Sequence, residues 1–417
     1  MVPENVKQVT GAQSPGENLE EETNMKYQFK RYFWVVSLVL ALPLLALAAF
    51  LTSSLGDNGK FDWFTVGTKT GTVIEHTIAY GVNEDGVAVG TYEESANTLN
   101  NEHGFVTKDE GEHIRALNYP GACATDVGAI NNPGVIAGTF EQWTGPGPCQ
   151  GNMIDDFAFK YEDGKFKKLN IPTTAKFKTT LDICTADGGV YDPAKKTCTV
   201  SVSGLDVRGI SDDEDVVGGF SSNNGSDLGF TFSEGKLRVL EACNETAISS
   251  TPEGCNPGFT DGWGVNDYYV VVGHYEDKKP FCEVDPEDGT VCETHHHGFI
   301  WTKKGEEGGF KKLYCDGDPA SNTDANGITD DGVIVGRCDS AAFVLFPPYG
   351  NSDWHTFTVP DPPAAGQFSC PTGSVVSKTI AWGISNERKI VGQYFCDGST
   401  GDKSYSFEVK VSDVVHN

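Results

Sequence analysis

The stretch GVNEDGVAVGTY, residues 81–92, places two short apolar runs on either side of a polar turn that contains glycine. Apolar runs that flank a turn of Asn, Asp and Gly residues are typical of a β-hairpin. Similar stretches recur along the chain, and we call their last glycines the anchoring glycines: Gly90, Gly138, Gly218, Gly273, Gly336 and Gly392. Their spacing of roughly 50–80 residues indicates repeats of one supersecondary unit with insertions of variable length.

Two further strand-like segments follow each hairpin, such as HGFVTK from His103 and HIRALN from His113. A short connection such as KDEGE joins them, so they should be neighbours in one sheet. This grouping leaves FDWFTV, residues 61–66, without preceding strands, and it leaves the last repeat, which ends near SYSFEVK, without a fourth strand. We therefore expect the first strand to complete the last sheet.

The sequence thus predicts an all-β fold, a six-bladed β-propeller of four-stranded antiparallel blades. Strand 61–66 would close the ring by completing the last blade, which leaves no major sheet edge exposed. Residues 60–417 would form this single domain.

The N-terminal part predicts export. Residues 1–24 form a polar tail, and residues 25–52 read as a signal peptide or a membrane anchor, because basic residues precede an uncharged apolar run from Phe33 to Leu51. Ala46 and Ala48 offer an A-x-A cleavage pattern, yet the run is near the length that spans a bilayer. The sequence does not decide whether this segment is cleaved or retained, or whether translation starts at Met1 or at Met25. The location is extracellular or at the cell surface, with the periplasm as an alternative.

The formal net charge of -28 argues against a nucleic acid partner, since affinity for phosphates rests on Lys and Arg. A membrane would be contacted only through the N-terminal segment, if it is not cleaved.

The 12 cysteines are an even count in an exported chain, which predicts disulfides. All of them fall in or beside two kinds of connection, the loop between the second and third strands of a blade and the crossover to the next blade. Those connections emerge on one face, which we call the long-loop face. The phase predicts the pairs Cys123–Cys149, Cys315–Cys338 and Cys370–Cys396. Cys184 with Cys198, Cys243 with Cys255 and Cys282 with Cys292 would close further loops, although the sequence leaves connectivity among these six open.

The repeated G-[IV]-[NST] turn with an [IV]-x-G strand, followed by HGF at His103 and His297 and FAF at Phe157, resembles the bacterial extracellular HAF repeat family. The resemblance implies an exported repeat protein of propeller type. It implies no established activity and no catalytic residue.

Candidate binding residues lie in the connections of the long-loop face. Trp143 offers an aromatic surface for a sugar or a protein, and Glu141 and Asp285, together with Asp155 and Glu283, offer carboxylates. His295 and His296 are candidate metal or ligand contacts, although adjacent strand residues point to opposite sides.

Asp316 and Asp318 are candidate calcium ligands in an acidic loop, and calcium is the one cofactor the sequence suggests. Trp263, Trp301 and Trp382 fall in strands and are expected to pack between blades.

These features favour an exported, disulfide-bonded binding module that recognises an extracellular glycan or protein through the long-loop face. One alternative is a polysaccharide-acting hydrolase or lyase that uses carboxylates on that face. Another is a structural component of a cell-surface assembly.

Overall fold

The structure is a computed structural model. It describes residues 61–64, 74–94, 102–108, 113–143, 154–222, 224–244, 255–256, 258–277, 281–285, 289–293, 295–303, 309–360, 370, 374–397 and 403–415. The chain divides into residues Met1–Thr52 and Ser53–Asn417. The predicted tail and the signal or anchor segment lie outside the described residues. Within the described ranges, no helix combines the length and the hydrophobicity needed for a membrane crossing.

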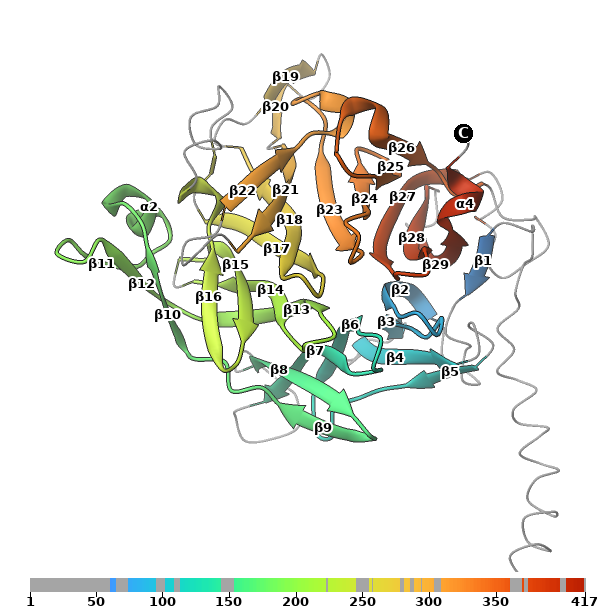
Figure 1. Cartoon of the computed structure of the whole chain (residues 1–417), viewed down its shortest axis with the longest axis horizontal. Helices are drawn as coiled ribbons and strands as arrows, with labels where there is room; N and C mark the ends of the chain where they lie inside the picture. Colours follow the sequence, from blue (N-terminus) through green and yellow to red (C-terminus); the bar gives the residue numbers. More distant parts are fainter. Residues whose placement is uncertain are drawn as a thin grey trace, which may run out of the picture. The chain divides into compact units, whose positions relative to one another are not determined.

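Antiparallel strand pairing groups most strands into six repeat units of four strands each, coloured in chain order in Figure 1. The first unit holds β2 (Ile74–Val82), β3 (Ala88–Glu94), β4 (Glu102–Lys108) and β5 (His113–Ala116). The second holds β6 (Ala124–Ile130), β7 (Ile136–Trp143), β8 (Ile154–Glu162) and β9 (Lys165–Lys168). The third holds β13 (Ser203–Ile210), β14 (Val216–Ser221), β15 (Asp227–Ser233) and β16 (Lys236–Leu240).

The remaining three units repeat this order. The fourth holds β17 (Phe259–Val265), β18 (Val270–Glu276), β21 (His296–Thr302) and β22 (Gly309–Leu313). The fifth holds β23 (Thr323–Ile328), β24 (Ile334–Cys338), β25 (Ala341–Leu345) and β26 (Trp354–Phe357). The sixth holds β27 (Val375–Ile384), β28 (Lys389–Asp397), β29 (Lys403–Lys410) and β1 (Phe61–Phe64).

The sixth unit joins the two ends of the described chain. Strand β1 pairs antiparallel with β29, with Phe61 opposite Val409 and Phe64 opposite Ser406. The first strand therefore completes the last unit, as the repeat phase predicts. Short parallel pairings, such as His76 opposite Ser404, also connect the sixth unit to the first and the third to the fourth.

The turns between the first and second strands hydrogen-bond to one another in a cyclic order. Each link joins the turn of one unit to that of the next, and the sixth turn bonds back to the first. The links are Glu84 N to Asn132 Oδ1 at 3.1 Å, Asn132 N to Asp212 Oδ1 at 2.8 Å, Asp212 N to Asp267 Oδ1 at 2.7 Å, Asp267 N to Asp330 Oδ1 at 3.0 Å, Asp330 N to Asn386 Oδ1 at 2.9 Å and Asn386 Nδ2 to Glu84 Oε1 at 3.1 Å. We call this set the turn ring.

Each turn also holds its own hairpin. Asn83 accepts a hydrogen bond from Val87 N through Oδ1 at 2.9 Å, and Gly86 has a φ of 74°, a conformation that glycine adopts without steric cost. The polar residues of the opening stretch therefore serve the turn.

Apolar side chains pack between neighbouring units. Val335 and Phe357 of the fifth unit, for example, share a buried cluster with Ile390 and Phe407 of the sixth. Sheets that bury both faces in this way leave only their ends and edges for function.

The second strand of each unit lies close to the first at the anchoring glycine. At Gly218 a Cβ atom would lie 1.9 Å from the carbonyl oxygen of Asp206, so a larger residue would force the two strands apart. Opposite this contact every first strand has a β-bulge, a residue skipped by the pairing register. The bulged residues are Tyr80, Gly128, Arg208, Trp263, Asn326 and Trp382.

Further elements lie in the connections. The insertion between the second and third units forms a sheet of β10 (Thr174–Lys178), β12 (Thr197–Ser201) and β11 (Val190–Asp192) with helix α2 (Leu181–Ala186). Thr180 caps this helix by accepting a hydrogen bond from Ile183 N. The others are η1 (Ala242–Asn244), β19 (Phe281–Asp285), β20 (Gly289–Glu293), η2 (Cys315–Gly317), η3 (Asn351–Asp353) and α4 (Val411–Val414).

Four disulfides are formed among the described residues. They are Cys184–Cys198, Cys243–Cys255, Cys315–Cys338 and Cys370–Cys396. Cys123 is also disulfide-bonded, while its expected partner Cys149 lies outside the described residues. Cys282 and Cys292 are directly opposite in the β19–β20 ladder, but their side chains are outside the described part.

Candidate functional site

The bulged residues of four units meet in a central aromatic cluster, formed by Tyr80, Arg208, Trp263 and Trp382. The rings of Trp263 and Trp382 stack with centroids 4.8 Å apart, and Tyr80 meets Trp382 edge-on at 5.6 Å. The Arg208 guanidinium lies 4.0 Å from the Trp263 ring centre, a cation–π contact. Because these residues belong to the first, third, fourth and sixth units, the bulges direct their side chains toward a common centre.

This arrangement departs from the packing expected for the tryptophans. Trp301 packs between the third and fourth units, 1% exposed, as predicted. Trp263 of the fourth unit and Trp382 of the sixth, however, contact each other, although the fifth unit lies between these two units in the turn ring. The bulge is the physical reason, because it turns the residue away from the face on which strand alternation would place it.

Four aspartates occupy one repeat position on the innermost strands. Asp126, Asp206, Asp261 and Asp324 each precede the bulged residue by two positions and the anchoring glycine by 12. Asp126, Asp206 and Asp261 surround Arg208, whose pKa their charges raise although burial opposes it. Asp206 forms the salt bridge with the guanidinium.

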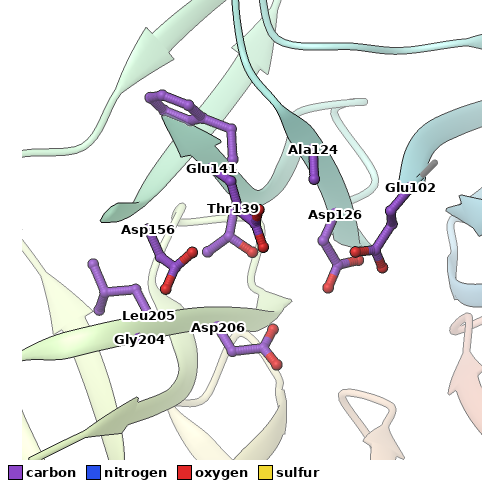
Figure 2. A pocket seen from close by; sticks show the side chains of 10 residues that line it. Glu102, Ala124, Asp126, Thr139, Glu141, Asp156, Gly204, Leu205 and Asp206 are labelled. Carbon is purple, nitrogen blue, oxygen red and sulfur yellow. The ribbon is translucent and has the colours of Figure 1, made fainter. Parts of the chain in front are cut away.

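A cavity of about 220 Å³ opens beside this centre. Its ten lining residues include five acidic and no basic side chains. The acidic residues, which define the central carboxylate cavity, are Glu102, Asp126, Glu141, Asp156 and Asp206. They come from the first three units, and Figure 2 shows them around a common space.

Burial and repulsion from neighbouring carboxylates raise the pKa values of three of these groups, Glu102, Asp126 and Asp156. The pKa of Glu102 rises to about 7 through burial and the charges of Glu93 and Glu141. The pKa of Asp156 rises to about 6, again through burial and then Glu141. For Asp126, burial and the Asp206 carboxylate hold the pKa well above its usual range. The cavity therefore contains carboxyl groups that exchange protons near neutral pH.

Buried polar atoms around the cavity are left without hydrogen-bond partners among the described residues. They include Asp126 Oδ1, Asp206 Oδ1, Asp261 Oδ1 and Arg208 Nε. A buried polar atom without a hydrogen-bond partner costs free energy, and a bound ligand can supply the missing partner.

The predicted site residues divide between this region and others. Glu141 lines the cavity. Trp143, expected on a loop, is instead the last residue of β7, opposite Ile154 of β8, and its buried Nε1 has no hydrogen-bond partner within the described part. Asp155 is exposed on β8 beside the cavity residue Asp156.

His296 lies next to a second group of titratable side chains on the fourth and fifth units. Its Nδ1 is 3.2 Å from Asp324 Oδ1, and its Nε2 is 3.4 Å from Glu276 Oε1. His295 is half-buried, with its ring 6.4 Å from that of His297. His297 is fully buried with Nε2 3.6 Å from Asp277 Oδ2, so consecutive histidines do point to different surroundings.

The remaining predicted residues are not brought to the cavity. Asp316 and Asp318 are exposed in and after η2, where Asp318 Oδ1 accepts a hydrogen bond from Ala320 N at 2.9 Å, a turn-forming role. A calcium site there stays a prediction. Glu283 and Asp285 belong to β19 by their backbone, and their side chains lie outside the described part.

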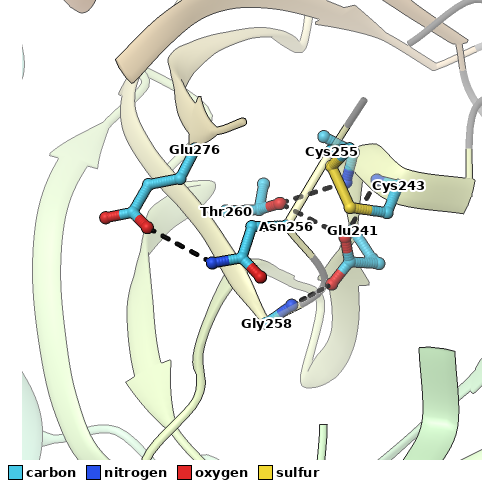
Figure 3. The surroundings of a disulfide bond; sticks show 8 residues. Glu241, Cys243, Cys255, Asn256, Gly258, Thr260 and Glu276 are labelled. Carbon is cyan, nitrogen blue, oxygen red and sulfur yellow. Dashed lines mark hydrogen bonds between the residues drawn. A yellow bond between two sulfur atoms is a disulfide. The ribbon is translucent and has the colours of Figure 1, made fainter. Parts of the chain in front are cut away.

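The buried carboxyl of Glu241 lies beside the Cys243–Cys255 disulfide (Figure 3). Glu241 accepts hydrogen bonds from Cys243 N at 2.9 Å and Gly258 N at 3.3 Å. Burial and the Glu241 charge raise the pKa of Asp187 to about 8. Since Glu241 already accepts backbone hydrogen bonds from Cys243 and Gly258, we assign it a structural role.

The sequence does not mark four of the five cavity carboxylates, Glu102, Asp126, Asp156 and Asp206, and it assigns the bulged Trp263 and Trp382 to packing between blades. The signal was present as an aspartate 12 residues before the anchoring glycine in four of six repeats. The bulge, which determines where these side chains point, leaves no mark in an alternating apolar pattern.

No family model matches the chain, and no curated protein matches it. Among solved structures, a Trypanosoma rangeli sialidase in complex with 2,3-difluorosialic acid aligns at a TM-score of 0.42 and 8% identity over 87% of this chain and 57% of the sialidase. The polysaccharide lyase Uly1 aligns at a TM-score of 0.38 and 11% identity over 81% of this chain and 78% of the lyase. The chain thus spans little more than half the length of the sialidase.

Proposed function

We propose that this protein is an exported six-bladed β-propeller that binds an amino-sugar glycan in the central carboxylate cavity. The propeller is supported by the six repeat units, by the pairing of β1 with β29 and by the turn ring that returns to its first member. Kinship with the HAF repeat family is part of this proposal and rests on the repeated turn.

Export is supported by the disulfides. Four bridges among the described residues fit an oxidising compartment, either outside the cell, at its surface or in the periplasm. A signal peptide or anchor at residues 25–52 belongs to the proposal in the same way.

The observation that carries the ligand proposal is the charge of the cavity. Five acidic side chains and no basic one line a space of about 220 Å³. A ligand with carboxylate groups, such as a sialic or uronic acid, would be repelled there. A cation would be attracted, and it would relieve the repulsion that adds to burial in raising the pKa values of Glu102 and Asp156.

The spacing of the carboxylates favours an organic cation over a single metal ion. Among the described residues, the groups of three or more donor atoms within 4.8 Å of one another lie elsewhere. An amino sugar supplies one ammonium group and several hydroxyl donors, so it can satisfy carboxylates that are spread around a cavity. A lysine side chain supplies a single ammonium group and would leave most of them unpaired.

Isothermal titration calorimetry on the full protein tests this proposal with two probes that differ in charge. The glucosamine hexamer carries free amines, whereas the N-acetylglucosamine hexamer is neutral. We expect the glucosamine hexamer to bind. Asp156→Asn and Glu102→Gln should each lower its affinity about tenfold, because each substitution removes a charge-assisted hydrogen bond. Glu162→Gln, a change at an exposed residue of β8, is the matched control. Equal binding of the two hexamers, or unchanged affinity in both cavity variants, would refute the proposal.

A second candidate function is cleavage of the bound glycan by general acid–base catalysis. The observation that favours it is the presence, in one cavity, of carboxyls with pKa values of about 6 and about 7, at Asp156 and Glu102. A carboxyl that keeps its proton near neutral pH can protonate a leaving group. Chromatography of the glucosamine hexamer after incubation decides between the candidates: shortened products that disappear in Asp156→Asn support an enzyme, and an intact hexamer that binds supports a binding module.

A further inference from the structure

Two histidines and an aspartate converge where the fourth and fifth units meet. His274 belongs to β18, His296 to β21 and Asp324 to β23. Asp324 Oδ1 lies 3.2 Å from His296 Nδ1 and 3.8 Å from His274 Nδ1. One ligand atom from each of the three residues lies within 4.8 Å of the other two.

We propose that His274, His296 and Asp324 form a binding site for a divalent first-row transition metal ion, with Zn²⁺ as the reference ion. Two imidazoles and a carboxylate are a donor set that such ions prefer. Bonds of about 2.0–2.1 Å in a tetrahedral site place neighbouring ligand atoms roughly 3.3 Å apart, close to the two distances seen here. Three protein ligands leave the fourth position of the metal for water or a substrate atom.

The surroundings of His296 match those of a metal-bound histidine. If Nδ1 binds the ion, Nε2 is free to donate its proton, and Glu276 Oε1 lies 3.4 Å from it. A carboxylate on the second ring nitrogen fixes the tautomer and the orientation of the imidazole. The strand register places Glu276 opposite His296, so the backbone holds this partner in position.

His274 provides an independent reason for a ligand. Its Nδ1 is buried and has no hydrogen-bond partner among the described residues, although it faces Asp324. The two imidazole rings stack with an interplanar angle of 3° and centroids 4.7 Å apart, so one ring must rotate for both in-plane lone pairs to meet a single ion. A metal ion would satisfy the orphan nitrogen.

Arg337 does not block the site. Its guanidinium Nη2 contacts Asp324 Oδ2 at 2.6 Å, whereas both histidines face Oδ1. One carboxylate oxygen is therefore held by the arginine and the other is directed at the imidazoles.

This site is separate from the central carboxylate cavity, whose lining comes from the first three units. The metal proposal therefore does not rest on the glycan proposal, and either can fail alone.

The test is a titration of the full protein, first freed of metal with a chelator, with Co²⁺ and then with Zn²⁺. We expect one Co²⁺ per chain with the visible absorption of a four- or five-coordinate ion, displacement by Zn²⁺, and a rise in Tm with Zn²⁺. His274→Gln and His296→Gln should each weaken Co²⁺ binding by about 100-fold or more, because even the loss of a residue that hydrogen-bonds a metal ligand lowers metal affinity by about 10–100-fold. His355→Gln, on the distant strand β26, should leave it unchanged.

Glu276→Gln supplies a variant that keeps all three ligands. It should fold and weaken Co²⁺ binding by about tenfold, because the carboxylate on His296 Nε2 is lost. The proposal is overturned if wild-type protein gives no Co²⁺ absorption, or if folded His274→Gln and His296→Gln bind the ion as wild type does. If the histidine variants fail to fold, an unchanged affinity in Glu276→Gln together with an unchanged wild-type Tm overturns it.

Discussion

Replacing Glu102 by glutamine removes one charge from the central carboxylate cavity and should stabilise the protein at high pH. The side chain is half-buried at the start of β4, and burial together with Glu93 and Glu141 raises its pKa from 4.5 to about 7. A raised pKa means that the folded state holds a proton which the unfolded chain has released. The free energy of unfolding therefore falls as the pH rises from about 4.5 to about 7.

The size of the effect follows from the shift. One pKa unit corresponds to about 1.4 kcal/mol, so the rise from 4.5 to about 7 corresponds to about 3 kcal/mol. At pH 8 the wild-type protein bears this whole cost and Glu102→Gln bears none of it. At pH 4.5 the carboxyl is protonated in the folded state and about half protonated in the unfolded chain, so the variant should differ from wild type by less than about 0.5 kcal/mol.

Urea unfolding at pH 4.5 and pH 8 measures this difference for wild type, Glu102→Gln and the exposed control Glu162→Gln. We expect Glu102→Gln to gain about 3 kcal/mol over wild type at pH 8 alone, and the control to track wild type at both values. A gain of the same size at both pH values would show that the amide packs better and that the charge is not the cause. No gain at pH 8 would show that the carboxylate is not destabilised in the folded state.

Two further changes test the framework. Asn131→Ala should lower the free energy of unfolding by about 2–4 kcal/mol in urea unfolding. Buried Asn131 donates a hydrogen bond through Nδ2 to Ser211 O of the third unit at 3.0 Å, and it accepts one from Val135 N of its own turn at 2.7 Å. A loss below about 1 kcal/mol would contradict the view that Asn131 joins the second unit to the third. The double change Cys184→Ser with Cys198→Ser should lower the free energy of unfolding by about 3 kcal/mol, since the disulfide spans a sequence separation of 14. An unchanged urea midpoint would show that the insertion unfolds independently of the rest of the domain.

The repeat framework could be predicted because its signals are local. A turn needs Asn83 and Gly86 at fixed positions, and the anchoring glycines permit the first two strands to approach closely. The assignment of strand β1 to the last unit followed from counting strands, and the Phe61–Val409 register agrees with it. The sequence does not predict helix α2, because six residues are too few to show a helical period.

The candidate site was only partly predictable. The sequence selects Glu141 as a carboxylate in a connection of the long-loop face; it lies within strand β7 instead, and it does line the cavity. Its partners Asp126 and Asp206 were not chosen, because they lie within strands that the pattern marks as framework. Side-chain direction there depends on the bulges at Gly128 and Arg208, and a bulge is a tertiary compromise that the alternating pattern does not encode.

The pairing of β1 with β29 sets an order of events during synthesis. Residues 61–64 leave the ribosome long before residues 403–410, yet their backbone partners are in that final strand. The earliest strand of the domain must therefore wait, unpaired, until nearly all of the chain has been synthesised. During that interval the half-made molecule has an open edge at both ends, so the last step of folding is also the step that removes its two sites for pairing with another chain.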